Sequence, residues 1–282
     1  MRAGRFAVLA LTAALATAGC GHHTQHPAEL VVGSRAGVES TLLADVYTGA
    51  LRSYGFPART EQAPDPLSKL DSGAFVVVPS LTGRVLQVFQ PGATARSDAQ
   101  VYKAMIGALP EGIAAGDYTT AAEDKPALAI AGSTSKDWGG SELGVLTKHC
   151  DGVTVGSVAG AVTPSAVGNC RLPKSREFPD DATLFAAVKS GEVTAAWTTT
   201  ADPNVPGDLV VLTDGKSALV QAENVVPLYR RNELNTRQLL AVNEVAGVLD
   251  TAALVDMRRQ VSAGADPQAV ADAWLNEHPL GR

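Results

Sequence analysis

The sequence lacks the short motifs by which many enzymes are recognised. The nucleophile motif G-x-S-x-G, the dinucleotide motif G-x-G-x-x-G, the P-loop and the zinc motif H-E-x-x-H are all absent from its 282 residues. Outside a histidine-containing stretch near the N-terminus, only His149 and His278 remain. Both stand at expected helix ends, where a cation complements the helix dipole. Because the sequence shows no pairing of a nucleophile with a general base, we predict that the protein is not an enzyme.

One partial enzyme motif is present, but the secondary structure expected around it does not fit that class of enzyme. Ser133 and Lys136 have the S-x-x-K spacing of penicillin-recognising enzymes, in which the serine must open a helix. Gly132 precedes this segment and two glycines follow it, so we expect a loop there. The matching K-T-G motif must lie on a strand, whereas Lys189-Ser190-Gly191 is typical of a helix end. We therefore reject this interpretation.

Positive charge is scarce as well. The chain has 23 Lys and Arg against 29 Asp and Glu, a formal net charge of −6. An acidic surface argues against nucleic acid as a partner and against electrostatic docking on anionic lipid. Charged residues make up only 18% of the chain and hydrophobic ones 45%, which favours large cores.

Long apolar runs are also missing, apart from one short run at the N-terminus. Arg2 and Arg5 precede an apolar segment from Phe6 to Ala16, which is shorter than the roughly 20 residues of a membrane-spanning helix. A positive start, a short apolar region and small residues before a cleavage site are typical of a secretory signal peptide. We assign residues 1–20 to it. Its removal leaves a chain long enough for two domains.

The end of this segment predicts a lipid anchor. Small residues followed by Gly19-Cys20 resemble the lipobox of bacterial lipoproteins, in which the cysteine is lipidated and becomes the N-terminus. Thr17 stands where that motif usually has Leu, and ordinary cleavage after Ala18 is the alternative. We expect an exported protein held at the outer face of the cytoplasmic membrane by lipid on Cys20, with no other membrane contact.

Residues 21–29 are predicted to be a flexible tether. Three histidines, His22, His23 and His26, lie there beside Gly and Pro, with no scaffold to fix a coordination geometry. We therefore expect no metal. The two remaining cysteines, Cys150 and Cys170, are an even number in an oxidising compartment, which predicts a disulfide. Two buried free thiols are the alternative.

Hydrophobic patterning predicts alternating strands and helices, and hence α/β layers. The helices carry clear start signals: Asp65-Pro66 and Asp266-Pro267 each pair an N-cap with a proline at the first helical position. Strands are expected at 30–34, 58–60, 75–78, 127–131, 153–156, 194–198, 209–212 and 225–229. Helices are expected from about 38 to 54, 66 to 72, 81 to 89, 97 to 109 and 181 to 190, and from 235, 250 and 267 onward.

Several segments resemble, in the same order, the glycine betaine and choline type of substrate-binding proteins that serve ABC importers. Residues 72–83 read Ser-Gly-Ala-Phe-Val-Val-Val-Pro-Ser-Leu-Thr-Gly, where the family has Ser-Gly-Glu-Ile-Asp-Leu-Tyr-Pro-Glu-Tyr-Thr-Gly. Val32-Gly-Ser-Arg matches an opening Val-Gly-Ser-Lys that is followed by Glu, as Glu39 follows here. Further matches are Ala127-Leu-Ala-Ile130, Ala187 to Thr200, Leu209 to Leu212, Asn224-Val-Val-Pro227 and Asp266-Pro-Gln-Ala-Val270.

The resemblance implies a two-lobed α/β fold of the periplasmic-binding-protein type II, with the ligand cleft between the lobes. Lobe 1 would comprise residues 30–117 and 225–282, and lobe 2 residues 118–224. The implied partners are a small-molecule ligand and an ABC permease in the membrane, with no cofactor. A lipid tether suits this role because it keeps the receptor near its permease. We expect a monomer.

The family's aromatic cage for a quaternary ammonium is largely replaced in this chain. Val78 and Leu81 stand at two cage-type positions, and Pro126 and Glu223 replace two further tyrosines. Aliphatic side chains lack the quadrupole by which ring faces attract a cation, so each lost ring removes up to about 2 kcal/mol. The residues that could rebuild part of a cage are Tyr118, Trp197 and Tyr229.

The polar positions are better retained. Arg35 replaces a family Lys that meets the ligand carboxylate, and an ion pair with Glu39 one turn later is the alternative. For Thr82, an N-cap role and contact with the ligand are equally supported. Glu223 is either a partner for an ammonium group or a solvated carboxylate at a strand end, and we slightly favour the solvated carboxylate. The predicted ligand-binding residues are Ser34, Arg35, Glu39, Val78, Ser80, Leu81, Thr82, Trp197, Thr198, Thr199, Glu223 and Asn224.

Two functions remain open at this point. The first is delivery of a small polar solute, betaine-like or otherwise bearing a carboxylate, to an ABC permease. The second is a non-transport binding or assembly lipoprotein that kept the fold and lost the quaternary-ammonium pocket.

Overall fold

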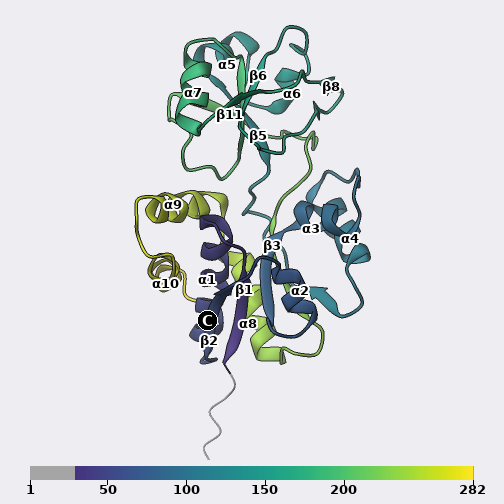
Figure 1. Ribbon diagram of the computed structural model, residues 1–282, viewed down its shortest axis with the longest axis vertical. Helices are drawn as coiled ribbons and strands as arrows, with labels where there is room; N and C mark the ends of the chain where they lie inside the picture. Colours follow the sequence, from purple (N-terminus) through teal and green to yellow (C-terminus); the bar gives the residue numbers. More distant parts are fainter. Residues whose placement is uncertain (1–28, 282) are drawn as a thin grey trace, which may run out of the picture.

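The computed structural model describes residues 29–281, which form two lobes, one above the other in Figure 1. The predicted signal peptide (1–20), the lipidation at Cys20 and nearly all of the predicted tether (21–29) lie outside these residues and stay predictions. Glu29 is described, and its carboxylate lies 3.2 Å from the guanidinium of Arg59.

The lower lobe contains a five-stranded sheet in the order β2-β1-β3-β12-β4. Its strands are β1 (Leu30–Ser34), β2 (Ala58–Gln62), β3 (Val77–Leu81), β4 (Ile113–Ala115) and β12 (Val225–Arg230). Strand β1 runs parallel to β2 and β3, whereas β12 is antiparallel to β3 and β4. Because β12 follows the whole upper lobe in sequence, the chain leaves the lower lobe after β4 and returns to it.

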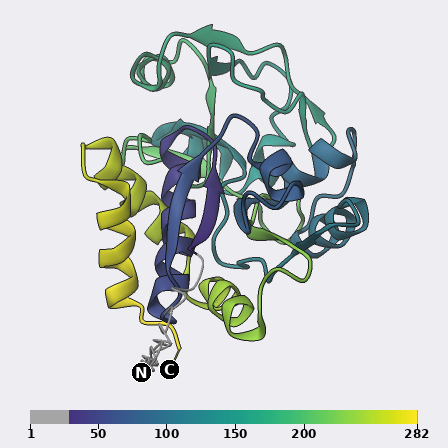
Figure 2. The same cartoon turned by 60° about the horizontal axis from the view of Figure 1, so that its bottom comes forward.

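Helices cover both faces of this sheet. One face carries α1 (Val38–Ser53), α8 (Thr236–Val248), α9 (Thr251–Ser262) and α10 (Pro267–Glu277), and the other carries α2 (Pro66–Asp71), α3 (Thr82–Phe89) and α4 (Asp98–Ala108). Successive strand residues point to opposite faces, so Val77 packs in the first core and Val78 in the second. In both views the yellow C-terminal helices and the blue α3 and α4 lie on opposite sides of β1 (Figures 1 and 2).

The predicted helix starts are confirmed in the lower lobe. The side chain of Asp65 accepts a hydrogen bond from the Ser68 N–H at 3.2 Å, and that of Asp266 from the Ala269 N–H at 2.9 Å. Asn235 begins α8 with a reciprocal capping box. These local signals fix where each helix begins, and the buried faces fix how it packs.

The upper lobe contains a second five-stranded sheet in the order β11-β5-β10-β6-β9. Its strands are β5 (Pro126–Ala131), β6 (Val155–Val158), β9 (Arg176–Phe178), β10 (Ala195–Thr199) and β11 (Leu209–Leu212), and its helices are α5 (Gly132–Trp138), α6 (Leu143–Leu146) and α7 (Asp181–Lys189). Leu184 and Phe185 of α7 pack against one face, whereas Leu143 and Leu146 of α6 pack against the other.

Helix α5 corrects one expectation from the sequence. Ser133 and Lys136 lie on this helix and not in a loop, because Gly139 adopts a left-handed conformation that ends the helix without preventing it. Lys189 does end helix α7, as predicted, so the second half of the penicillin-type motif still lacks its strand.

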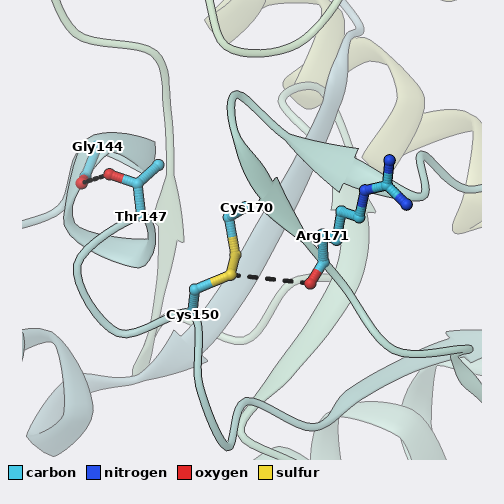
Figure 3. Close-up of a disulfide and its surroundings, with 5 residues drawn as sticks. All are labelled: Gly144, Thr147, Cys150, Cys170 and Arg171. Atoms are coloured by element: carbon cyan, nitrogen blue, oxygen red, sulfur yellow. Dashed lines mark hydrogen bonds between the residues drawn. A yellow bond between two sulfur atoms is a disulfide. The ribbon is translucent and has the colours of Figure 1, made fainter.

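The predicted disulfide is present in the upper lobe (Figure 3). Cys150 follows α6, and Cys170 lies on β8 (Cys170–Arg171), which pairs with β7 (Ala166–Val167). The Cys150 sulfur lies 3.7 Å from the Arg171 carbonyl oxygen; a disulfide sulfur carries no proton, so this is a contact and not a hydrogen bond. The bridge ties the small hairpin to α6, in a region with few regular hydrogen bonds.

Two connections join the lobes, residues 116–125 between β4 and β5 and residues 213–224 between β11 and β12. The lobe boundaries predicted after residues 117 and 224 lie in these connections, although the residue-by-residue division stays a prediction. Over residues 29–281 no single helix has the length and apolarity to cross a membrane; α8 and α9 reach that threshold only together, across a bend of 97°.

Candidate functional site

A cavity of about 900 Å³ lies where the two lobes face each other. Arg35, Arg84 and Arg96 line it from the lower lobe, and Thr163 and Thr199 line it from the upper lobe. Asp124 and Glu223, one from each connecting segment, also belong to its lining. Clefts of this size that combine apolar walls with a few polar groups are typical of small-molecule sites.

Two smaller cavities adjoin this cleft. One of about 300 Å³ shares Thr163 and Thr199 with it and adds Trp197, Thr198 and Arg258 to the lining. The other, of about 140 Å³, lies in the lower lobe. Arg35 and Arg84 line both this small pocket and the large cleft, so the two guanidinium side chains stand between them.

The structure brings nine of the twelve predicted ligand-binding residues to these cavities. They are Arg35, Glu39, Val78, Ser80, Leu81, Trp197, Thr198, Thr199 and Glu223. Arg35, Thr199 and Glu223 line the large cleft itself, whereas Val78, Ser80 and Leu81 line the small pocket. Contact of any of them with a ligand stays a prediction.

Ser34, Thr82 and Asn224 line none of these three cavities and are buried, Ser34 at the end of β1 and the other two beside the lobe connections. The N-cap of α3 is Leu81 and not Thr82, so the N-cap interpretation of Thr82 is wrong. Its hydroxyl oxygen accepts the Asn224 N–H at 3.1 Å, and the Asn224 amide donates to the Thr119 carbonyl at 3.0 Å. The first bond joins α3 to the return connection, and the second joins the two connecting segments to each other. They make Thr82 and Asn224 parts of the hinge region.

The ion pair weighed against a ligand role for Arg35 is not the one that forms. Glu39 pairs with Arg84, whose Nη1 lies 3.0 Å from the carboxylate. Within residues 29–281 the guanidinium of Arg35 makes no ion pair, and only its backbone N–H is bonded, to the Ser40 hydroxyl at 2.9 Å. Burial raises the pKa of Glu39, and Asp124 adds to this, while Arg84 opposes it. Because Glu39 is taken by Arg84, the exposed guanidinium of Arg35 stays unpaired within the described residues, and Arg35 lines the cleft.

Glu223 is buried, with 8% of its surface exposed, so its interpretation as a solvated carboxylate is wrong. Its carboxylate accepts the backbone N–H of Arg84 at 2.9 Å, at the first turn of α3, where the helix dipole favours negative charge. Burial nevertheless raises the pKa of Glu223 to about 7, because it outweighs this hydrogen bond and the Arg84 charge. The side chain titrates near neutrality at the edge of the cleft.

Asp124 is a central residue of the site to which no sequence motif pointed. It is 3% exposed, and its carboxylate lies 3.1 Å from Arg258 and 3.8 Å from Arg84, both in the lower lobe. It also accepts the N–H of Ala201 in the upper lobe at 3.2 Å. Arg84 directly follows the matched segment 72–83, so the resemblance could have pointed to it. Asp124, Arg96 and Arg258 lie outside every matched segment.

The aromatic residues that could rebuild a cage lie in the cores. The ring of Tyr118 contacts that of Tyr102 in a tilted arrangement with centroids 4.5 Å apart, and Tyr229 packs beside the first lower-lobe core. Trp197 is the single aromatic residue in the lining of the cleft and the two adjoining cavities, and its ring is 6% exposed within an upper-lobe core. Among the described residues the lining therefore contains no tyrosine, and the positively charged groups are guanidinium side chains.

Two sheets joined by two connecting segments, with a cleft between them, define a ligand-binding protein of the type II periplasmic-binding-protein class. The chain belongs to the OpuAC family, described as the substrate binding domain of ABC-type glycine betaine transport systems, whose family model matches residues 28–277. No curated protein matches the chain. Members of this family bind small molecules and pass them to a membrane permease, and they are not known as enzymes.

Solved structures share the fold at low sequence identity. A glycine betaine/carnitine/choline ABC transporter structure matches with a TM-score of 0.73 and 14% identity, covering 89% of this chain and 98% of the other. Apo YehZ from Escherichia coli matches with a TM-score of 0.69 and 18% identity, over 89% and 99%. Lactococcal OpuAC, closed on glycine betaine, matches with 0.51 and 10% identity, over 89% and 96%. The predicted fold class is thus confirmed.

Proposed function

We propose that the protein is an exported, lipid-anchored receptor that captures a small carboxylate-bearing solute and delivers it to an ABC permease. The observation that carries this proposal is the cleft of about 900 Å³ with Arg35, Arg84 and Arg96 in its lining. Guanidinium groups bind carboxylates through paired hydrogen bonds. The protein acts without a cofactor and without catalysis, as a monomer tethered through Cys20.

The tyrosine-free lining favours a carboxylate as the recognised group over a quaternary ammonium. A cation that cannot donate hydrogen bonds is held by ring faces, and Val78 and Leu81 offer none. Glycine betaine itself therefore binds weakly or not at all. The same observation supports the second candidate, a binding or assembly lipoprotein that lost transport.

Lobe closure separates the two candidates. The purified protein is titrated with glycine betaine, choline, carnitine, proline and simple carboxylates, first by thermal shift and then by X-ray scattering. A transported ligand at 100 times its Kd raises the stability by about 2.7 kcal/mol and compacts the scattering envelope. A protein that never compacts with any solute in a metabolite library contradicts the transport proposal.

Arg35→Ala tests the anion contact. Loss of an exposed arginine leaves the free energy of unfolding within about 0.5 kcal/mol, whereas binding of the carboxylate ligand is abolished. The exposed Arg231, which lines none of the cavities, serves as the control in Arg231→Ala. Equal ligand affinity in the two variants removes Arg35 from the site.

The anchor is tested by Cys20→Ala expressed in a bacterial host that processes lipoproteins. Lipidation at Cys20 predicts that the native protein stays with the membrane fraction and incorporates labelled palmitate, while the variant does neither. Palmitate labelling that survives the substitution contradicts an anchor at this cysteine.

A further inference from the structure

We propose that the small pocket beneath Arg35 and Arg84 holds the apolar body of the ligand, so that the solute is a monocarboxylate with a hydrocarbon portion of four to six carbons. This inference rests on the proposed function and deepens it. It names the class of solute and the part of the cleft that selects it.

The pocket has the size and lining for such a group. Its volume is about 140 Å³, and a dry apolar cavity of about 150 Å³ accommodates a molecule of the size of benzene. Eight of its thirteen lining residues are apolar, among them Leu43, Leu67, Val78, Leu81, Val85 and Val88. Val78 and Leu81 stand where the resemblance places cage tyrosines, so aliphatic side chains leave a space where rings would stand.

The charges around the pocket call for one further carboxylate. Arg35 and Arg84 line both the pocket and the large cleft, and Arg84 already has two carboxylate partners, Glu39 at 3.0 Å and Asp124 at 3.8 Å. Arg35 has no carboxylate partner within residues 29–281. A single negative group placed beside Arg35 completes the pairing, and its hydrocarbon portion then points into the pocket.

The test compares acids that share the carboxylate and differ in the hydrocarbon. Calorimetric titrations use acetate and 3-methylbutanoate, with 3-methylbutanamide as the uncharged counterpart and glycine betaine as the quaternary one. Each buried carbon strengthens binding about fourfold, so 3-methylbutanoate binds about 60-fold more tightly than acetate. The amide, which offers no charge to Arg35, binds far more weakly than the acid.

Two variants with matched controls assign the effect to this pocket. Val88 lies in its lining and is 54% exposed, so Val88→Trp fills the space without disturbing the core. It abolishes the preference for 3-methylbutanoate over acetate. Ile106→Trp, at a 43% exposed position of α4 away from the cavities, retains the preference. Arg35→Gln abolishes binding of every acid, and Arg231→Gln does not.

The outcomes separate this inference from the function on which it rests. A 60-fold preference that Val88→Trp removes supports it. Acids of equal affinity, an amide that matches the acid, or glycine betaine as the only binder overturn it, and in each case ligand-induced compaction of the lobes keeps the transport proposal standing. Absence of both binding and compaction across the panel and a metabolite library overturns the two together.

Discussion

Replacement of Glu223 by Gln tests whether a buried carboxyl on the segment that connects the lobes makes the stability of the protein depend on pH. The Glu223 carboxyl lies on the return connection between the lobes and is 8% exposed. Burial is the largest cause of its raised pKa of about 7, against an ordinary value of 4.5. Hydrogen bonds from the N–H groups of Arg84 and Gly83 oppose the shift without cancelling it.

The sign of the pH dependence follows from the raised pKa. The folded state binds the Glu223 proton more tightly than the unfolded state, so this group favours folding fully below about pH 4.5 and progressively less as the pH rises to about 7. A difference of about 2.5 pKa units corresponds to about 3 kcal/mol. Ionisation of Glu223 above neutral pH therefore costs the folded state up to that amount.

Glu223→Gln keeps an oxygen that accepts the Arg84 N–H and removes the titration. The assay is urea unfolding followed by tryptophan fluorescence at pH 4.5 and pH 8, with the exposed Glu111→Gln as the control. The stability of the variant relative to the native protein should rise by about 3 kcal/mol between the two pH values. A difference that stays constant with pH refutes the assigned burial of a charge at this position.

Two further predictions concern stability alone. Cys150→Ser with Cys170→Ser removes the bridge, which spans 20 residues of sequence, and should cost about 3 kcal/mol. The measurement is urea unfolding of the variant against the native protein, oxidised and reduced; a variant as stable as the oxidised protein contradicts the role given to the bridge. Asp124→Asn leaves the half-buried guanidinium of Arg258 without its carboxylate at 3.1 Å and should cost about 3 kcal/mol, whereas Asp256→Asn, at an exposed ion pair, should cost under about 1 kcal/mol.

The fold could be predicted from the sequence because its signals are local. Cap residues such as Asp65 and Asp266 fix helix starts through bonds to residues three positions away. Buried strands show as short apolar runs, and most expected strands and helices lie within two residues of their observed bounds. Most of the elements that were not predicted are short: β4, β7, β8 and β9 have two or three residues each and α6 has four, too few for a pattern to show. The seven residues of α5 were expected to form a loop because glycines flank them.

The site could be predicted only where it coincides with a matched motif. Arg35, Val78 and Leu81 were found because they stand at recognisable positions of a family pattern. Asp124 and Arg258 are 134 positions apart, and no spacing rule connects them. The depth of Glu223 was misjudged for a related reason, since the α3 residues that bury it lie about 140 positions earlier in the chain.

The departures from the family pattern acquire a meaning only when the space around them is known. In the sequence comparison, Val78 and Leu81 show only that two aromatic rings are missing, and such rings hold a quaternary ammonium. In three dimensions both border an apolar pocket of about 140 Å³ that opens beside two arginines. Smaller side chains at a binding position leave volume that a ligand can fill, and each carbon that fills it adds about 0.8 kcal/mol. Loss of the cage and gain of an apolar pocket are thus one structural change, and it moves the expected specificity from the cationic end of a solute to its hydrocarbon body.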